Sequence, residues 1–116
     1  MHGMRSKTSY KSKDMKTGIL IKVHESSGNR ILAVADKELI GKRFEEGDMC
    51  LDITERFYKG EEKTEEEIIK AMKDAANINI VGKKSIALGI KSGIITEDSV
   101  IKINGVPHAI SIKYGI

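Results

Sequence analysis

The dipeptide Asn104-Gly105, set between two apolar runs, is the feature that most restricts how this chain can fold. A two-residue hairpin turn of type I′ needs positive φ at both central positions, and Asn-Gly adopts that conformation readily. Residues 100–103 and 106–114 are therefore predicted to form an antiparallel hairpin. Pro107 falls just inside the returning strand, where a residue without a backbone N–H is tolerated only at an edge, a strand start or a bulge. We expect it to end or bend the ladder and to set how His108 projects, and whether its peptide bond is cis stays open.

The N-terminal half shows the same kind of pattern. Residues 19–23 alternate in hydropathy, and a second apolar run at 31–35 follows a polar turn, which together predict a β-hairpin. Gly47 lies in a turn before a further predicted strand at 49–54, in which alternate residues share a face. One face of that strand should carry Met49, Leu51 and Ile53, and the other Cys50 and Asp52.

Two main helices are predicted in the second half. Thr64 caps the first of them, and Glu67 reaches back to complete a capping box. The second is expected within residues 80–93. It would carry Gly82 and Gly89 on one face, and because interior glycines weaken a helix, something must approach that face closely.

These elements predict an α+β fold, with a mainly antiparallel sheet of about five strands and two main helices packed on one face. A short helical turn at 37–40, capped by Asp36 and closed by Gly41 in the left-handed conformation, joins two of the strands. The 116 residues suit one domain with a single core.

Basic charge is concentrated at the N-terminus. The formal net charge is +3, but the first 16 residues hold five basic residues against Asp14, which leaves 15 basic and 16 acidic residues in the remainder. We expect residues 1–14, which are poor in apolar side chains, to form a disordered basic arm, and residues 15–116 to form the domain. The arm could bind RNA phosphates. Met15 is an alternative to Met1 as the translation start, and under that alternative the argument from charge disappears.

Other features of the composition exclude whole classes of protein. Cys50 is the only cysteine, so an internal disulfide or a cysteine-rich zinc site is impossible. His2, His24 and His108 lack the spacing of metal ligands, and we predict neither a metal nor a cofactor. Because the uncharged stretches are too short to span a bilayer and the start lacks a signal peptide's apolar centre, we expect a cytoplasmic protein without membrane contact.

His108 is the strongest candidate for chemistry, because an imidazole titrates near neutral pH and can donate or accept a proton. Cys50 and Asp52 could join it as nucleophile and orienting carboxylate if the fold brings the three side chains together. The sequence has no nucleophile elbow or other local signature of such a site. A histidine satisfied in an edge strand and a small buried cysteine are the competing interpretations.

Basic and aromatic residues favour a different function, the binding of nucleic acid. The segment 56–59 places two aromatic residues between two basic ones and could stack an unpaired base, or its Phe57 could instead fill the core beneath the first main helix. Lys83 and Lys84 fail the Walker pattern but could form a looser anion site at a helix N-terminus. The candidate nucleic-acid-binding residues are Lys42, Arg43, Arg56, Tyr58, Lys59, Lys83, Lys84 and His108.

Five segments of the chain carry a family resemblance. They are DKELIGKRFEEG at 36–47, LDI at 51–53, FYKG at 57–60, NIVG at 79–82 and GVPHA at 105–109. In order and spacing they resemble the archaeal family called domain of unknown function 424, over roughly residues 17–113. The structural landmarks of the motifs are Gly41, Gly47, Gly82, Gly105 and Pro107. The resemblance implies a small archaeal protein in a translation or RNA-processing setting, and it implies no activity.

We therefore predict a non-catalytic cytoplasmic module that binds RNA or a ribonucleoprotein such as the ribosome. A small-molecule enzyme or ligand-binding protein with a pocket around His108 is one alternative. The other is an interaction protein, including a homo-oligomer, that assembles through the edge strand of the C-terminal hairpin.

Overall fold

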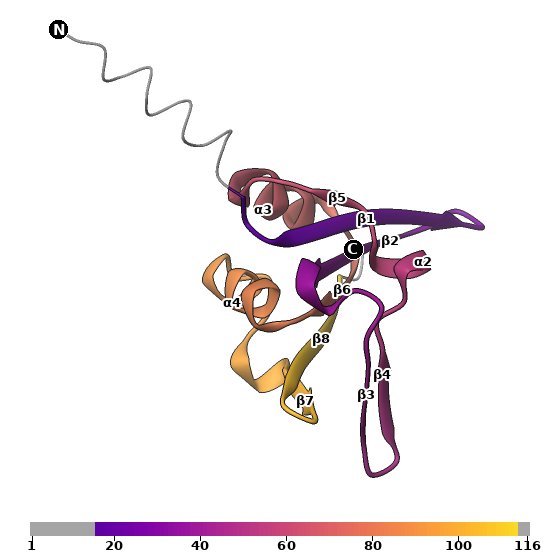
Figure 1. Cartoon of the computed structure of the whole chain (residues 1–116). Coiled ribbons are helices and arrows are strands. Elements are labelled where there is room, and N and C mark those ends of the chain that lie inside the picture. Colours follow the sequence, from indigo (N-terminus) through magenta and orange to yellow (C-terminus); the bar gives the residue numbers. More distant parts are fainter. Residues whose placement is uncertain (1–15, 114–116) are drawn as a thin grey trace, which may run out of the picture.

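Three layers make up the part of the chain that the computed structural model describes, residues 16–113 (Figure 1). Helices α3 (Glu65–Asp74) and α4 (Lys83–Lys91) cover one face of a six-stranded sheet. The other face carries a separate hairpin and the short helix α2 (Glu55–Tyr58). The predicted arm lies outside the described residues. None of the helices within them is long and apolar enough to cross a membrane.

The main sheet has the strand order β5-β1-β2-β6-β8-β7. Its strands are β1 (Ile19–Ser26), β2 (Asn29–Asp36), β5 (Glu61–Glu62), β6 (Asn77–Val81), β7 (Ile101–Ile103) and β8 (Val106–Ile112). Neighbouring strands are antiparallel except for β2 and β6, which run parallel. The separate hairpin consists of β3 (Arg43–Glu46) and β4 (Met49–Asp52), and two 3₁₀ turns are η1 (Lys37–Leu39) and η2 (Glu97–Ser99). The α+β class is confirmed, and the predicted sheet of about five strands is corrected to a mixed sheet of six.

Strand β6 makes the sheet mixed, and the sequence pattern predicted the start of a helix at this point. The strand predicted at 49–54 lies in the separate hairpin instead, and the short strand β5 was also not predicted. Ile78 and Ile80 are fully buried on the helix side and Val81 on the opposite side, and a short, largely buried apolar run of this kind is typical of a central strand. The connection from β2 to β6 includes α3, which lets β6 enter the sheet parallel to β2. Helix α4 consequently begins only at Lys83.

The local predictions are confirmed where the signal lies in a few adjacent residues. β1 and β2 pair along their whole length, as the alternating pattern predicted. Asn104 and Gly105 have φ of 50° and 83°, as a type I′ turn requires. In the capping box of α3, Thr64 Oγ1 accepts from the Glu67 N–H at 3.1 Å, and Glu67 Oε1 accepts from the Thr64 N–H at 3.0 Å.

Pro107 lies where β8 extends past the end of β6. The last pair of that ladder joins Val81 to His108, so the missing N–H of Pro107 removes no bond to β6. Its carbonyl still accepts a hydrogen bond from the Gly82 N–H at 2.9 Å. No peptide bond within residues 16–113 is cis. The proline is therefore accommodated at the start of a strand, one of the places that the sequence predicted for it.

The sheet separates two apolar clusters. The cluster on the helix side includes Leu32, Val34, Ile68, Met72, Ile78 and Ile80. The cluster on the opposite side includes Ala33, Ala35, Leu51, Ile53, Tyr58, Val81 and Ile103. Phe57 packs against the second cluster, so the expectation that it fills the core beneath α3 is wrong. The reason is that α2 and α3 lie on opposite faces of the sheet (Figure 1).

Candidate functional site

The carboxylate of Asp36, at the end of β2, caps helix α4. Its Oδ1 accepts hydrogen bonds from the Ser85 N–H at 2.8 Å and the Ser85 hydroxyl at 2.7 Å, and its Oδ2 accepts one from the Lys84 N–H at 3.0 Å. The predicted cap on the following turn η1 is absent, since the Asp36 side chain makes no capping hydrogen bond there. The anion site expected at this helix N-terminus is thus filled by a carboxylate of the chain itself.

Glycine at position 82 is what lets Asp36 approach. Gly82 has a φ of 108°, and a Cβ added to it would lie 2.3 Å from the Asp36 Cγ. A Cβ added to Gly89 would lie 3.1 Å from the Ile95 side chain and 3.2 Å from that of Ile80. The expected close approach at both glycines is confirmed, although Gly82 precedes the helix and only Gly89 lies within it.

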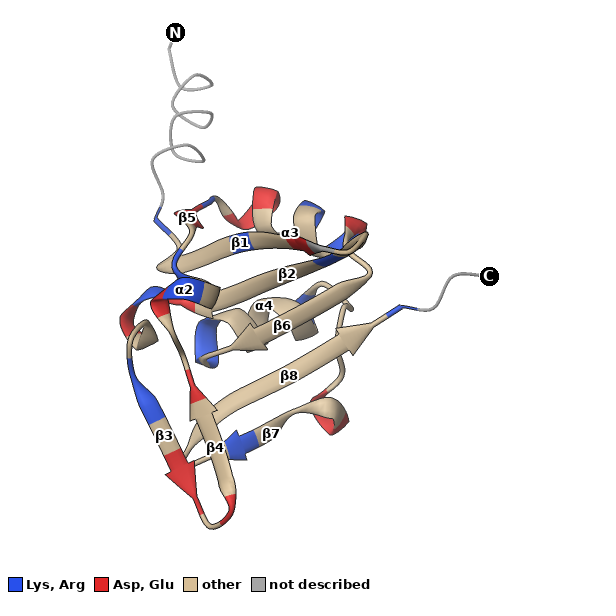
Figure 2. Cartoon of the chain, turned by 90° about the vertical axis from the view of Figure 1, so that its right-hand side faces the viewer, with Lys and Arg blue, Asp and Glu red and all other residues tan. Residues whose placement is uncertain are grey.

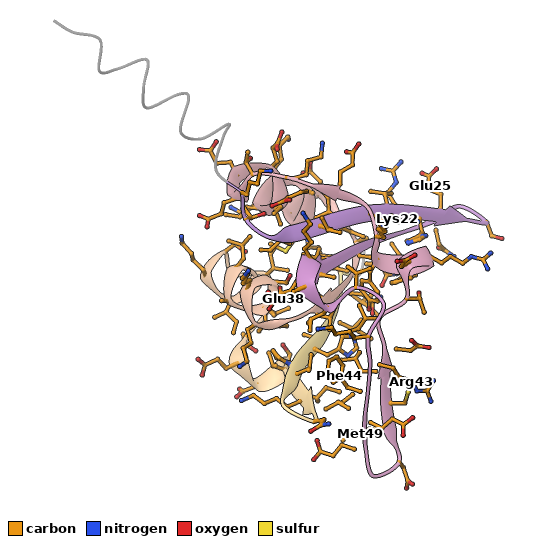
Figure 3. The ribbon with its side chains drawn as sticks, in the orientation of Figure 1. Lys22, Glu25, Glu38, Arg43, Phe44 and Met49 are labelled. Carbon is orange, nitrogen blue, oxygen red and sulfur yellow. The ribbon has the colours of Figure 1, made fainter. Side chains whose placement is uncertain are left out.

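The hairpin β3–β4 has an inner side that faces the main sheet and an outer side that faces away. Phe44 and Met49 point inward, whereas Arg43 points outward (Figure 3). Cys50 and Asp52 lie on the same side as Arg43, because cross-strand partners share a face and Asp52 pairs with Arg43. Cys50 is exposed, so the interpretation of a buried cysteine is wrong. The apolar side chains of the hairpin thus take inner positions together with Glu46, the register partner of Met49, and the outer positions hold Arg43, Glu45, Cys50 and Asp52.

His108 lies on the sheet itself, in register with Val81 on one side and Ile101 on the other. Its ring is half-buried, and desolvation lowers its pKa, which favours the neutral imidazole. Cys50 and Asp52 project from the far side of the hairpin, so the structure does not assemble the three candidate catalytic residues into one site. Within residues 16–113, no group of three or more His, Cys, Asp and Glu side chains could hold a metal ion.

The two aromatic residues of α2 are occupied within the molecule. Tyr58 is only 5% exposed, and burial raises its pKa to about 12, so it cannot stack on a base as the sequence predicted. Phe57 stacks on His24 with ring centroids 4.4 Å apart and an interplanar angle of 6°. His24 Nε2 lies 2.7 Å from the Phe57 carbonyl oxygen, and Lys22 Nζ donates to the Arg56 carbonyl at 2.6 Å. These contacts fix α2 on β1.

The candidate basic residues fall into two groups on opposite sides of the sheet. The residues on or next to the hairpin and α2 are Lys42, Arg43, Arg56 and Lys59. Lys83 and Lys84 belong to α4 on the helix side. Acidic neighbours pair with several of them, namely Glu45 with Arg43 at 2.9 Å, Glu55 with Lys59 at 4.0 Å and Glu38 with Lys84 at 3.7 Å. From Lys16 to Lys113 the chain holds 16 basic and 16 acidic residues. Because the two groups lie on opposite sides of the sheet, the candidate basic residues do not form one surface.

A surface that sequence reasoning missed lies on the face of the sheet that carries the hairpin. Beside the hairpin and α2, part of β6, β7 and β8 is left uncovered, and in this view β6 and β8 carry no charged segment while β7 carries one blue segment (Figure 2). We call this surface the open face; its residues are Asn77, Asn79, Ile101, His108, Ile110 and Ile112. The isoleucines at 101, 110 and 112 are 50%, 53% and 50% exposed. The signal in the sequence that could have indicated this surface was that β8 has no Lys, Arg, Asp or Glu on either of its faces.

The two edge strands of the main sheet are short. β5 has two residues and β7 has three. Because the residue pair next to a two-residue turn exchanges hydrogen bonds, the outward backbone groups of β7 are those of Lys102. The N–H groups on either side are used, since Val100 donates to the Glu97 carbonyl and Asn104 to the Glu46 side chain. β7 itself therefore offers little to an added strand, but β8 continues past it over residues 109–112, and assembly by strand addition stays a prediction.

Comparison with known proteins points to a family without a known activity. The family model described as "Protein of unknown function (DUF424)" matches residues 24–114. The crystal structure of an uncharacterized conserved protein from Methanopyrus kandleri has a similar fold, with a TM-score of 0.68 and 23% identity over 84% of this chain and 95% of that chain. No curated protein matches the chain.

Proposed function

The chain belongs to the DUF424 family, as the sequence resemblance predicted, and from this premise we propose that it is a non-catalytic cytoplasmic module that docks its open face on a protein surface of a ribonucleoprotein. The observation that supports the proposal is the group of three half-exposed isoleucines on that face. Exposed apolar patches on soluble proteins are common at sites of interaction. The family's description assigns no activity, so the proposal rests on the surface alone.

The chemistry of the open face favours a protein surface over phosphate groups. β6 and β8 contain no Lys, Arg, Asp or Glu, and Asn77 and Asn79 supply amide donors and acceptors between the isoleucines. The centres of protein interfaces are likewise depleted of charge and rich in apolar side chains. An RNA surface would instead require basic side chains and accessible aromatic rings.

An RNA component would meet the same side of the molecule at two basic residues. Lys42 lies beside the hairpin and Arg56 lies on α2, and both side chains are exposed. Neither takes part in an ion pair within residues 16–113, in contrast to Arg43 and Lys59. A ribonucleoprotein can therefore contact the open face with a protein surface and contact Lys42 and Arg56 with RNA phosphates.

The proposal is tested by cosedimentation of the full chain with purified archaeal ribosomal subunits over a range of salt concentrations. Ile110→Asp places a charge in the middle of the open face. Val23→Asp is the matched control, because Val23 is 54% exposed against 53% for Ile110 and lies on the opposite face of the sheet. We expect Ile110→Asp to weaken binding about tenfold or more, as for an interface centre, and Val23→Asp to leave it unchanged.

A second pair of variants separates the RNA contribution. Lys42→Glu with Arg56→Glu should weaken binding only at low salt, while Lys70→Glu with Lys73→Glu, on α3, should have no effect. If binding falls steeply with salt and is unchanged by Ile110→Asp, the contact is with RNA and does not involve the open face. Failure of the full chain to bind either subunit would overturn the proposal of a ribonucleoprotein partner. Comparison with a form that starts at Met15 would measure how much residues 1–14 contribute to binding.

A further inference from the structure

A groove of about 490 Å³ lies on the helix side of the sheet, between α4 and the C-terminal hairpin. It exists because the sheet extends past α4, so that β7 and the start of β8 are not covered by a helix. Ile86 and Ile90 form its α4 wall, and Val100 and Pro107 form the apolar part of the opposite wall. The groove is open to solvent rather than enclosed, which suits an extended segment better than a small molecule that must be almost fully buried.

The two walls of this groove each contribute a lysine. Lys83 comes from the first turn of α4, and Lys102 comes from β7, where it pairs with Pro107. Neither ammonium group takes part in an ion pair within residues 16–113. Glu97 is the acidic residue that lines the groove, so positive charge is in excess there. An acidic ligand would match that excess.

A second groove, on the other side of α4, provides a comparison. It has a volume of about 530 Å³ and is also lined by lysines, among them Lys84 and Lys91. Those lysines already pair with carboxylates, Lys84 with Glu38 at 3.7 Å and Lys91 with Glu65 at 3.2 Å. A ligand carboxylate there would have to displace an existing partner. Lys16 also lines this second groove, but both lysines that α4 contributes to it are paired, whereas Lys83 and Lys102 pair with no carboxylate within residues 16–113.

We propose that this groove binds an acidic segment of a partner protein. An Asp or Glu side chain of the segment accepts hydrogen bonds from the ammonium groups of Lys83 and Lys102, and such charge-assisted bonds are stronger than neutral ones. A neighbouring apolar side chain of the segment packs on Ile86 and Ile90. The groove and the open face lie on opposite faces of β7 and β8, so this inference is independent of the ribonucleoprotein partner and each can fail alone.

The experiment is selection of a random dodecapeptide display library on the immobilised full chain. Each round is counter-selected on the variant Lys83→Glu with Lys102→Glu, which removes the proposed contacts. Both lysines are exposed, and circular dichroism confirms that the variant is folded before use. We expect enriched peptides that carry Asp or Glu next to an apolar residue. Their affinity for the variant should be weaker by about tenfold or more.

The matched control is Lys70→Glu with Lys73→Glu, which changes the net charge equally on the exposed side of α3. It should bind the selected peptides as the unaltered chain does. Enrichment without acidic residues, no enrichment, or equal binding to both double variants would overturn the proposal. A single-stranded RNA pool is tested in parallel, and RNA binding that is lost on Lys83→Glu with Lys102→Glu, without any peptide consensus, would assign the two lysines to RNA instead.

Discussion

The Asp36 carboxylate and the Ser85 hydroxyl lie 2.7 Å apart, although 49 residues separate them in the sequence. Both residues are buried, with exposures of 2% and 0%. Buried polar groups are stable only when they are hydrogen-bonded, and here each satisfies the other. The contact joins the end of β2 to the start of α4 and thereby fixes the helix on the centre of the sheet.

Replacing Asp36 with Ala should strongly destabilise the fold. The substitution leaves the N–H groups of Lys84 and Ser85 and the Ser85 hydroxyl without a partner, and we expect a loss of about 3 kcal/mol in the free energy of unfolding. Urea denaturation followed by circular dichroism measures it. Glu38→Ala is the control, because its pair with Lys84 is exposed and should contribute less than about 1 kcal/mol. Equal losses in the two variants would contradict this role for Asp36.

Gly82→Ala should be more damaging than alanine at another glycine with positive φ. At Gly82 the new Cβ would lie 2.3 Å from the Asp36 Cγ, in addition to the strain of a φ of 108°. Gly93, with a φ of 79° and nothing within 4 Å of an added Cβ, isolates the strain. We expect a loss of about 1 kcal/mol for Gly93→Ala and about 3 kcal/mol for Gly82→Ala in denaturation experiments. A smaller loss at Gly82 than at Gly93 would mean that Asp36 moves away freely.

His108 should make stability fall in mildly acidic solution. Burial lowers its pKa in the folded state, so between the folded and unfolded pKa values the unfolded chain binds more protons. The contribution of neutral His108 is fully present above the unfolded pKa of about 6.5 and is lost as the pH falls through the folded pKa. Denaturation midpoints measured across this range should decrease less steeply in His108→Gln. Identical slopes in the two proteins would rule out His108 as the source.

Cys50 should react readily in the folded protein, because it is exposed on the outer side of the hairpin. We expect Ellman's reagent to titrate one thiol at a similar rate with and without denaturant. Cys50→Ser should abolish the signal and change the free energy of unfolding by less than about 0.5 kcal/mol, as for an ordinary surface substitution. A thiol that reacts only after unfolding would show that the hairpin packs differently.

Two isoleucines on adjacent strands should respond very differently to truncation. Ile80 of β6 is fully buried, so Ile80→Ala should reduce the free energy of unfolding by about 3 kcal/mol or more. Ile110 of β8 is 53% exposed, so Ile110→Ala should reduce it by less than about 1 kcal/mol. Equal losses, measured by urea denaturation, would mean that the open face is covered in the free protein.

The sequence predicted those elements whose cause is local. Alternation specifies β1 and β2, Asn104-Gly105 specifies the C-terminal turn, and Thr64 with Glu67 specifies the start of α3. Strand β6 was not predicted, because a short apolar run fits a helix or a central strand equally well and only its neighbours β2 and β8 decide between them.

The candidate site was predicted less well, for the same reason. Asp36 caps a helix that is distant in the sequence. The sequence instead assigned it to the turn that follows it directly, η1, where its side chain makes no capping hydrogen bond. Tyr58 was expected to be accessible and is buried, whereas Cys50 was expected to be buried and is exposed. The exposure of both residues depends on which face of the sheet α2 and the hairpin pack against. The open face can be identified only once the positions of the hairpin and α2 on the sheet are known.

The central position of β6 has a consequence for synthesis of the chain from its N-terminus. β1 and β2 emerge first and can pair at once, but β2 lacks its second neighbour until the chain has been made through Val81. The carboxylate of Asp36 likewise has no partner until Lys84 and Ser85 emerge. A nascent or truncated chain that stops after α3 therefore presents an unpaired β2 edge to other chains, and such edges promote aggregation. Completion of the C-terminal third closes the sheet and protects the first hairpin.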